Sequence, residues 1–268
     1  MSKKKNKFLS LLQYEASRNF KVIALNVLIT MVITIALYYI ESLAVVGSYE
    51  NNVLFQGVIY DMAIRPLGMN RGKTYIFFLE ILLIIIFSIF IWAREFYSEN
   101  KTIYRSLSLP IKKCNLILSK SLVVLLFFGM FLLGQFLSII INWLMLKIKL
   151  GSNFNIELNV LTEALFNNIS YGFISMDMVN LTVMIIFIFL ISLIGALAVF
   201  LKQSFGIKGI VYWIIYVIIT IFIFFYVPVT KLHLFAIEFL LLYTIGLLIY
   251  IGITFMLNNY LINKKINV

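Results

Sequence analysis

The chain is short of charged residues, and this excludes an ordinary soluble domain. Only 12% of its 268 residues are charged, whereas 63% are hydrophobic. Soluble domains carry about 25% charged and about 45–50% apolar residues. The segments between the apolar stretches are too short for a separate soluble domain. We therefore predict a single membrane domain over residues 1–268.

Groups that carry out catalysis are also scarce. His233 is the only histidine and Cys114 the only cysteine, so an internal disulfide and a two-histidine zinc motif are both impossible. The sequence contains neither Gly-x-Ser-x-Gly nor the phosphate-binding Gly-x-x-x-x-Gly-Lys-Ser/Thr. We expect no intrinsic enzyme activity, no metal site and no cofactor bound by this chain.

Six apolar stretches are long enough to cross a bilayer, which requires about 20 residues in a helix. Their apolar character is continuous rather than alternating, which predicts helices and an all-α membrane protein. The three prolines, Pro66, Pro110 and Pro228, fall outside all six predicted spans. This argues against an ion-coupled carrier with broken helices. The predicted spans are 22–42, 75–93, 116–146, 179–201, 209–227 and 234–257.

The distribution of basic residues predicts the orientation of these spans. Sixteen of the 22 lysines and arginines lie in the N-terminal arm, the loops after the second and fourth spans, and the C-terminal tail. Cytoplasmic loops carry such an excess. We therefore place both termini in the cytosol, at the cell membrane. Orientation also accounts for the net charge of +11, so we expect no nucleic-acid partner.

A short amphipathic segment precedes the first span. Phe8, Leu11, Leu12, Ala16 and Phe20 fall on one face of a helix, just after a run of lysines. This pattern is typical of a helix that lies in the headgroup layer. A frayed basic tail is the alternative.

Polar residues inside the spans need partners, because lipid offers none. They recur every four residues in the first span and at a related spacing in the third, and the second and sixth spans contain Glu80 and Glu238. Either they hold helices together or they line a wet path through the bundle. The candidates for such a path are Asn26, Thr30, Thr34, Glu80, Gln135 and Asn142.

The loop between the second and third spans has a distinct pattern. Glu99 lies at the predicted start of a short helix, where a carboxylate is stabilised by the helix dipole. Ile103 and Leu107 fall on one face of this helix, and Pro110 ends it. Such a short helix below the membrane would expose its apolar face. It therefore predicts a soluble partner.

This segment resembles the coupling helix of type-2 ATP-binding-cassette transporter membrane subunits. The shared pattern is an acid, a short polar run, a threonine, then Leu-x-Leu-Pro-Ile and a basic residue before a span with an early Ser-Lys. Here Ile103, Tyr104 and Arg105 follow Thr102, where the family often has an acid. The residues concerned are Glu99, Thr102, Ile103, Tyr104, Arg105, Leu107, Leu109, Pro110, Ile111, Lys112, Ser119 and Lys120.

The resemblance implies a permease, meaning the membrane subunit of an exporter, paired with a second copy or a paralogue. Two separate ATPase subunits would use ATP and Mg²⁺, and their closure would push the coupling helices. The substrate would be amphipathic: a peptide, an antibiotic or a lipid. A membrane protein that sequesters a toxin without transport is the alternative, and an intramembrane enzyme is a further one.

Overall fold

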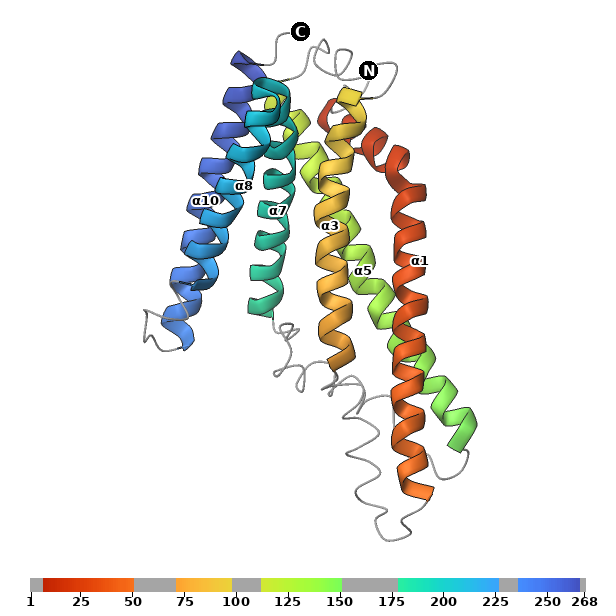
Figure 1. Cartoon of the computed structure of the whole chain (residues 1–268). Coiled ribbons are helices and arrows are strands. Elements are labelled where there is room, and N and C mark those ends of the chain that lie inside the picture. Colours follow the sequence, from red (N-terminus) through yellow and green to blue (C-terminus); the bar gives the residue numbers. More distant parts are fainter. Residues whose placement is uncertain (1–6, 51–70, 98–111, 151–177, 227–235, 266–268) are drawn as a thin grey trace, which may run out of the picture. The chain divides into compact units, whose positions relative to one another are not determined.

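The computed structural model describes residues 7–50, 71–97, 112–150, 178–226 and 236–265, and these residues are helical except at the turns. The described residues form helices and no strand (Figure 1). They are α1 (Lys7–Glu50), α3 (Arg71–Tyr97), α5 (Lys113–Leu150), α7 (Met178–Phe205), α8 (Ile207–Ile221), the π-helical turn η3 (Phe222–Tyr226) and α10 (Ala236–Lys264).

The helices confirm the all-α prediction and contain the predicted spans, apart from a few terminal residues. Five helices have stretches that are long and apolar enough to cross a membrane: α1, α5, α7, α8 with η3, and α10. The remaining predicted span, residues 75–93, lies in α3, whose apolar centre is bounded by Glu80 and Arg94. The helices extend past the apolar stretches, because polar residues can continue a helix into the headgroup layer and water. Only the first residues of the sixth predicted span and Val227 lie outside the described residues.

The segment predicted as a separate interfacial helix is the beginning of α1, which continues without interruption from Lys7 to Glu50. Leu11 is buried, as its place on the predicted apolar face requires, whereas Phe20 is 57% exposed. The polar residues Glu15 and Asn19 are buried together with Leu11. The face that packs inward is therefore rotated from the apolar face predicted from the sequence.

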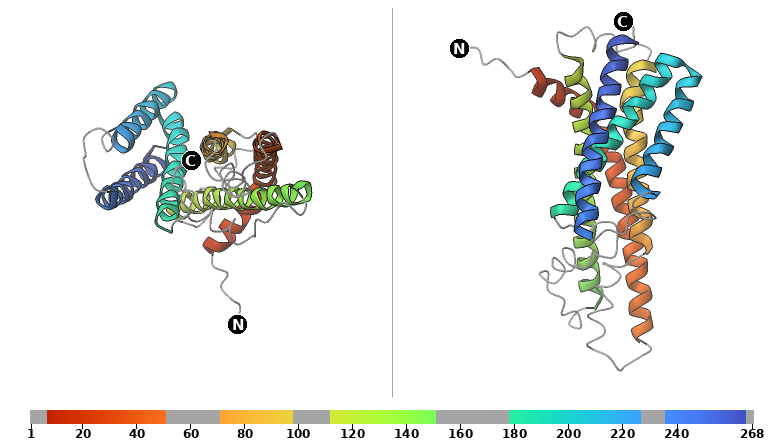
Figure 2. Two further views of the ribbon diagram at one scale, coloured as in Figure 1. Left: turned by 90° about the horizontal axis from the view of Figure 1, so that it is seen from below. Right: turned by 90° about the vertical axis from the view of Figure 1, so that its left-hand side faces the viewer.

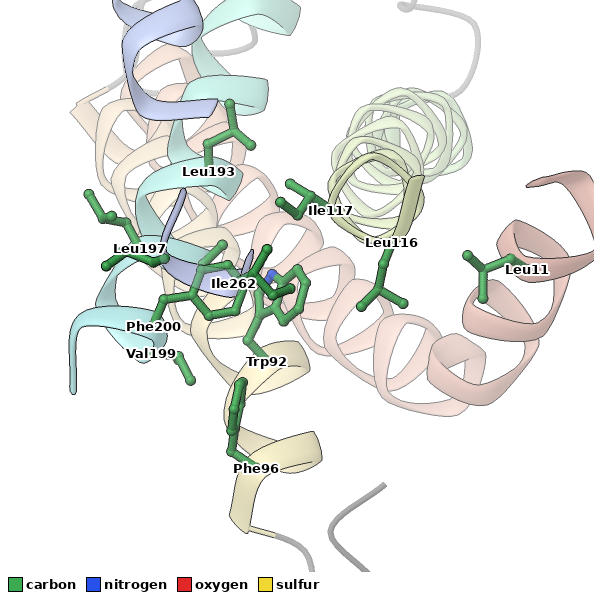
Figure 3. Packing of buried hydrophobic residues seen from close by; sticks show 12 residues of the cluster. Leu11, Trp92, Phe96, Leu116, Ile117, Leu193, Leu197, Val199, Phe200 and Ile262 are labelled. Carbon is green, nitrogen blue, oxygen red and sulfur yellow. The ribbon is translucent and has the colours of Figure 1, made fainter. Parts of the chain in front are cut away.

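The chain divides into two compact units. Unit 1 comprises residues 1–19, 83–126 and 183–268, and unit 2 comprises residues 20–82 and 127–182. Unit 1 has a core of buried aliphatic and aromatic side chains, in which Trp92, Phe200 and Ile262 lie together (Figure 3). The rings of Trp92 and Phe200 meet edge to face with their centroids 4.7 Å apart, the arrangement that aromatic quadrupoles favour.

Two small residues let α3 and α7 approach closely in unit 1. A Cβ atom at Gly195 would lie 2.8 Å from the Cβ of Ser88 and 3.2 Å from the backbone nitrogen of Ile89. Small residues at such crossings are typical of membrane helices, because packing rather than apolar burial holds them together. Glycine is required at position 195 for this contact.

A tight turn joins α7 to α8 at Gly206, whose φ of 60° lies in the left-handed region that favours glycine. The turn brings α8 back along α7, and α10 runs beside them (Figures 1 and 2). Tyr216 and Tyr250 stack with centroids 5.3 Å apart. Their hydroxyl groups lie 2.7 Å from Thr254 and 2.8 Å from Thr220, respectively. These bonds supply polar partners between α8 and α10.

Within unit 1, side-chain contacts join several helix ends that the sequence predicts to lie on the cytosolic side of the membrane. Lys202 near the end of α7 lies over the ring of Tyr97 at the end of α3. Lys113 at the start of α5 donates a 3.1 Å hydrogen bond to the carbonyl of Ile262 in α10. The ends flanking residues 98–111 therefore lie at the same end of unit 1 as the end of α10 (Figure 1).

Unit 2 is held by one face of α1 that packs against α5. Ile23, Val27, Thr30 and Thr34 are buried at helical spacing. A Cβ atom at Gly134 of α5 would lie 3.1 Å from Val27 Cγ1. The two helices thus approach closely where the polar side chains of α1 face inward.

Candidate functional site

Four charged side chains form a buried ionic cluster in unit 1: Glu15 of α1, Arg18 of α1, Glu95 of α3 and Lys120 of α5. Lys120 Nζ lies 2.8 Å from Glu95 Oε1 and 3.3 Å from Glu15 Oε1. Arg18 Nη1 lies 3.2 Å from Glu95 Oε1 and 3.9 Å from Glu15 Oε1. Both cations therefore bridge both carboxylates, and three helices meet at these contacts.

The burial of this cluster is unusual for charged residues. Glu15 and Lys120 are each 1% exposed and Glu95 is 0% exposed, whereas the side chain of Arg18 is 20% exposed. Charged residues are almost never fully buried unless they are paired. Here each buried carboxylate lies close to two cations, and such pairing offsets part of the cost of burying charge.

Further polar and aromatic groups surround the cluster. Asn19 donates a 2.7 Å hydrogen bond to the carbonyl of Glu15 and accepts a 2.9 Å bond from Arg94 Nη2. Lys120 Nζ also lies 4.9 Å from the centre of the Trp92 ring, within the range of a cation–π interaction. The ammonium group is thus held by two carboxylates and an indole face, in surroundings from which water is largely excluded.

Some hydrogen-bonding capacity in the cluster is unused. Oε2 of Glu15 and Oε2 of Glu95 are buried without a hydrogen-bond partner among the described residues. The carboxylates therefore depend on the two cations that meet their Oε1 atoms. Removing one cation would leave buried negative charge with fewer partners, which is costly in a medium of low dielectric constant.

Lys120 belongs to the Ser-Lys motif at the start of the third span, and its place in this cluster was not predicted. The spacing of the charged residues nevertheless carries a signal. Glu15 follows Leu11 by four residues, Glu95 follows Trp92 by three, and Lys120 follows Leu116 by four. Each charge thus shares a helical face with a large buried side chain. This spacing indicates that the three charges face inward, and the distances between helices decide which of them pair.

In unit 2 the structure brings together three of the predicted path residues. Gln135 Nε2 of α5 lies 2.5 Å from Glu80 Oε1 of α3 and 3.3 Å from Thr34 Oγ1 of α1. Thr34 is 0% exposed and Glu80 is 6% exposed. One amide thus links polar groups from three helices. The side chains of this set thus contact other helices, and their place on a substrate path stays a prediction.

The other predicted path residues bond mainly within their own helices. Asn26 Nδ2 donates to the carbonyl of Val22 at 2.8 Å, and Thr30 Oγ1 donates to the carbonyl of Val27 at 3.0 Å. Asn142 Nδ2 donates to the carbonyl of Ser138 at 3.0 Å. These bonds satisfy the donors locally, so the three residues do not join the Gln135 group through them.

Asn142 and Ser138 nevertheless face the interior of unit 2. Both are almost fully buried, and Ser138 Oγ lies 3.4 Å from the carbonyl of Met31 in α1. The Oδ1 atom of Asn142 is buried without a hydrogen-bond partner among the described residues. The buried surface between α1 and α5 therefore retains a free acceptor.

The predicted docking residues lie outside the described part of the structure. They are Glu99, Thr102, Ile103, Tyr104, Arg105, Leu107, Leu109 and Pro110, all within residues 98–111. The side chain of Glu238 is likewise outside the described residues. Among the described residues, no group of three or more His, Cys, Asp or Glu side chains is arranged to hold a metal ion.

The fold and the two polar groups define an all-helical membrane protein with buried charge in one unit and a buried carboxyl–amide–hydroxyl group in the other. In comparisons with known proteins, no family model, no curated protein and no solved structure matches the chain. The function is therefore inferred from the residues themselves.

Proposed function

We propose that the chain is the membrane-spanning permease of an ATP-binding-cassette exporter. Separate ATPase subunits hydrolyse ATP with Mg²⁺, and the chain couples this hydrolysis to the export of an amphipathic peptide, antibiotic or lipid. It lies in the cell membrane with both termini in the cytosol, and it pairs with a second copy or a paralogous permease. Residues 99–110 form the coupling helix to which the ATPase binds.

The sequence of residues 99–110 is the observation that carries this proposal. It combines an acid, an apolar face, Leu-x-Leu-Pro-Ile and a basic end. Support comes from the helices on either side: α3 ends at Tyr97 and α5 begins at Lys113. Both ends join the buried core of unit 1 through Phe96 and Leu116. A segment between two firmly packed helix ends is suited to receive a push from a soluble partner.

The proposal also assigns a place to the beginning of α1. We take residues 7–19 to lie at the inner headgroup layer. Leu9 and Tyr14 are each 59% exposed there, while Glu15 and Asn19 face the core of unit 1. An apolar outer surface next to basic residues is suited to anionic lipid headgroups.

For the substrate path, the proposal uses the polar residues of unit 2. Thr34, Gln135 and Glu80 form its centre, and Asn26, Thr30 and Asn142 extend it along α1 and α5. An acid inside a membrane span is a functional-site candidate by default. The hydrogen bonds of Gln135 to both Glu80 and Thr34 support this choice.

Co-purification tests the proposed function. A tagged chain is isolated in mild detergent from cells that also express its own neighbouring genes, and the bound proteins are identified by mass spectrometry. We expect a nucleotide-hydrolysing subunit in the parent sample. The double variant Leu107→Ala/Leu109→Ala should recover it at least fivefold less, because the apolar face of the coupling helix is lost.

A matched control removes the same groups elsewhere. Leu242 and Leu248 of α10 are 52% and 56% exposed, so Leu242→Ala/Leu248→Ala deletes two leucine side chains from a surface suited to lipid. This control should retain the ATPase. Equal recovery with both double variants would refute docking at residues 99–110. Absence of any ATPase from the parent sample would favour the toxin-binding alternative.

A further inference from the structure

The ionic cluster lies close to the end of α3 and within about two turns of the start of α5. Glu95 lies two residues before the end of α3 at Tyr97, and Lys120 lies about two turns after the start of α5 at Lys113. Glu15 lies about two turns after the start of α1. The contacts of Lys120 Nζ with both carboxylates therefore connect both flanks of the docking segment to α1.

We propose that Glu15, Glu95 and Lys120 are positioning residues that make the start of α1 move as one body with the two helix ends flanking residues 99–110. Displacement of the docking segment would then be passed to α1 through the cluster. This inference rests on the proposed function, because it needs an ATPase that displaces the segment.

Burial makes this connection suitable for transmitting movement. An exposed ion pair can separate and exchange its partner for water, so it resists displacement weakly. Lys120 and the two carboxylates are almost fully buried, so separation would leave charges without water or partners. The cluster is therefore stiff against relative displacement of the three helix ends.

Spin-label distances test whether these helix ends move together. One label is attached to Cys114, the single native cysteine, at the start of α5. The other is attached to Leu9→Cys, where the parent leucine is 59% exposed. Distances are measured by pulsed electron paramagnetic resonance on the ATPase complex in lipid nanodiscs, without nucleotide and with ATP trapped by a hydrolysis-deficient ATPase.

The three most deeply buried charges of the cluster are removed by the triple variant Glu15→Gln/Glu95→Gln/Lys120→Met, which leaves Arg18, whose side chain is 20% exposed. Replacing buried ion pairs by neutral groups is often close to neutral for stability, so this variant separates movement from folding. Glu95→Gln alone is the second variant, because it keeps the shape and the contact between Lys120 and Glu15. Lys264→Met is the control, since Lys264 is an exposed cation of α10 outside the cluster.

We expect the parent and Lys264→Met to show the same narrow distance with and without ATP. The triple variant should bind the ATPase to within twofold of the parent. Its distance distribution should become at least twice as broad or shift between the two states, and Glu95→Gln should show the same change to a smaller extent. The ATPase activity of the triple-variant complex, relative to free ATPase, should differ from the parental ratio by at least threefold.

Three results would overturn the inference. One is an unchanged, narrow distance in both the triple variant and Glu95→Gln. Another is a parental distance that itself changes when ATP binds. The third is loss of ATPase binding by a folded triple variant, because the cluster would then shape the docking surface. Absence of an ATPase from the parent preparation would instead refute the proposed function on which the inference rests.

Discussion

Replacing Lys120 by methionine should destabilise unit 1 by about 3 kcal/mol. Removing one partner from a buried ionic pair costs about 3–5 kcal/mol, because the remaining charge stays buried without compensation. Lys120 Nζ lies 2.8 Å from Glu95 and 3.3 Å from Glu15, so two carboxylates lose a partner. Arg18 remains 3.2 Å from Glu95 and compensates in part, which favours the lower end of the range.

The magnitude can be read from thermal unfolding in detergent, followed by the fluorescence of the three tryptophans. One kcal/mol shifts Tm by about 2–4 °C in a domain of about 150–250 residues. Lys120→Met should therefore unfold about 6–12 °C below the parent chain. Methionine retains much of the apolar length of lysine, so the loss reports chiefly on charge.

Two comparisons make this measurement decisive. Lys264→Met removes an exposed cation that lies over Tyr260, so it should cost less than about 1 kcal/mol. Adding Glu15→Gln and Glu95→Gln to Lys120→Met should recover most of the lost stability, because the unpaired carboxylates are then removed and the side chain of Arg18, which is 20% exposed, keeps access to water. A Tm for Lys120→Met equal to that of Lys264→Met would refute the reasoning.

Further predictions concern three polar or close contacts, each measured by thermal unfolding in detergent. Gln135→Leu should cost about 1–3 kcal/mol, because it leaves Glu80 buried without its amide donor. Gly195→Val should cost about 1–3 kcal/mol or more, since its side chain would collide with Ser88 and the α3 backbone. Tyr216→Phe should cost only about 0.6 kcal/mol, the average for hydrogen bonds between membrane helices.

Specific outcomes would contradict these predictions. A Gln135→Leu chain as stable as the parent would mean that Glu80 finds another partner. If Gly195→Val were as stable as the parent chain, the contact between α3 and α7 would have room for a larger side chain. A cost of several kcal/mol for Tyr216→Phe would assign the α8–α10 hydrogen bonds a larger role than packing.

The sequence was sufficient to predict the helices because their apolar stretches are long and continuous. The helix ends were harder to predict, because α5 and α10 continue into polar residues that hydropathy does not distinguish from loops. The π-helical turn η3 after α8 left no signal in the composition of the segment. The prediction of a single domain over residues 1–268 stays a prediction.

The polar contacts were only partly predictable from the sequence. Periodicity on each helix indicated that Thr34 and Gln135 face inward, but only the rotation of three helices in space decides that Gln135 meets Glu80. Lys120 was harder to assign, because a lysine near a predicted span end is equally suited to the inner headgroup layer. Pairing across helices depends on distances that one-dimensional spacing cannot provide.

Site-specific photocrosslinking from the docking segment tests the central claim most directly. A photoreactive amino acid is placed at position 103 or 107, and in a control at position 248 of α10, in cells that express the neighbouring genes. We predict a crosslink from positions 103 and 107 to a nucleotide-hydrolysing subunit and none from position 248. Crosslinks that join positions 103 and 107 only to lipid, or only to proteins that do not bind nucleotide, would contradict the account.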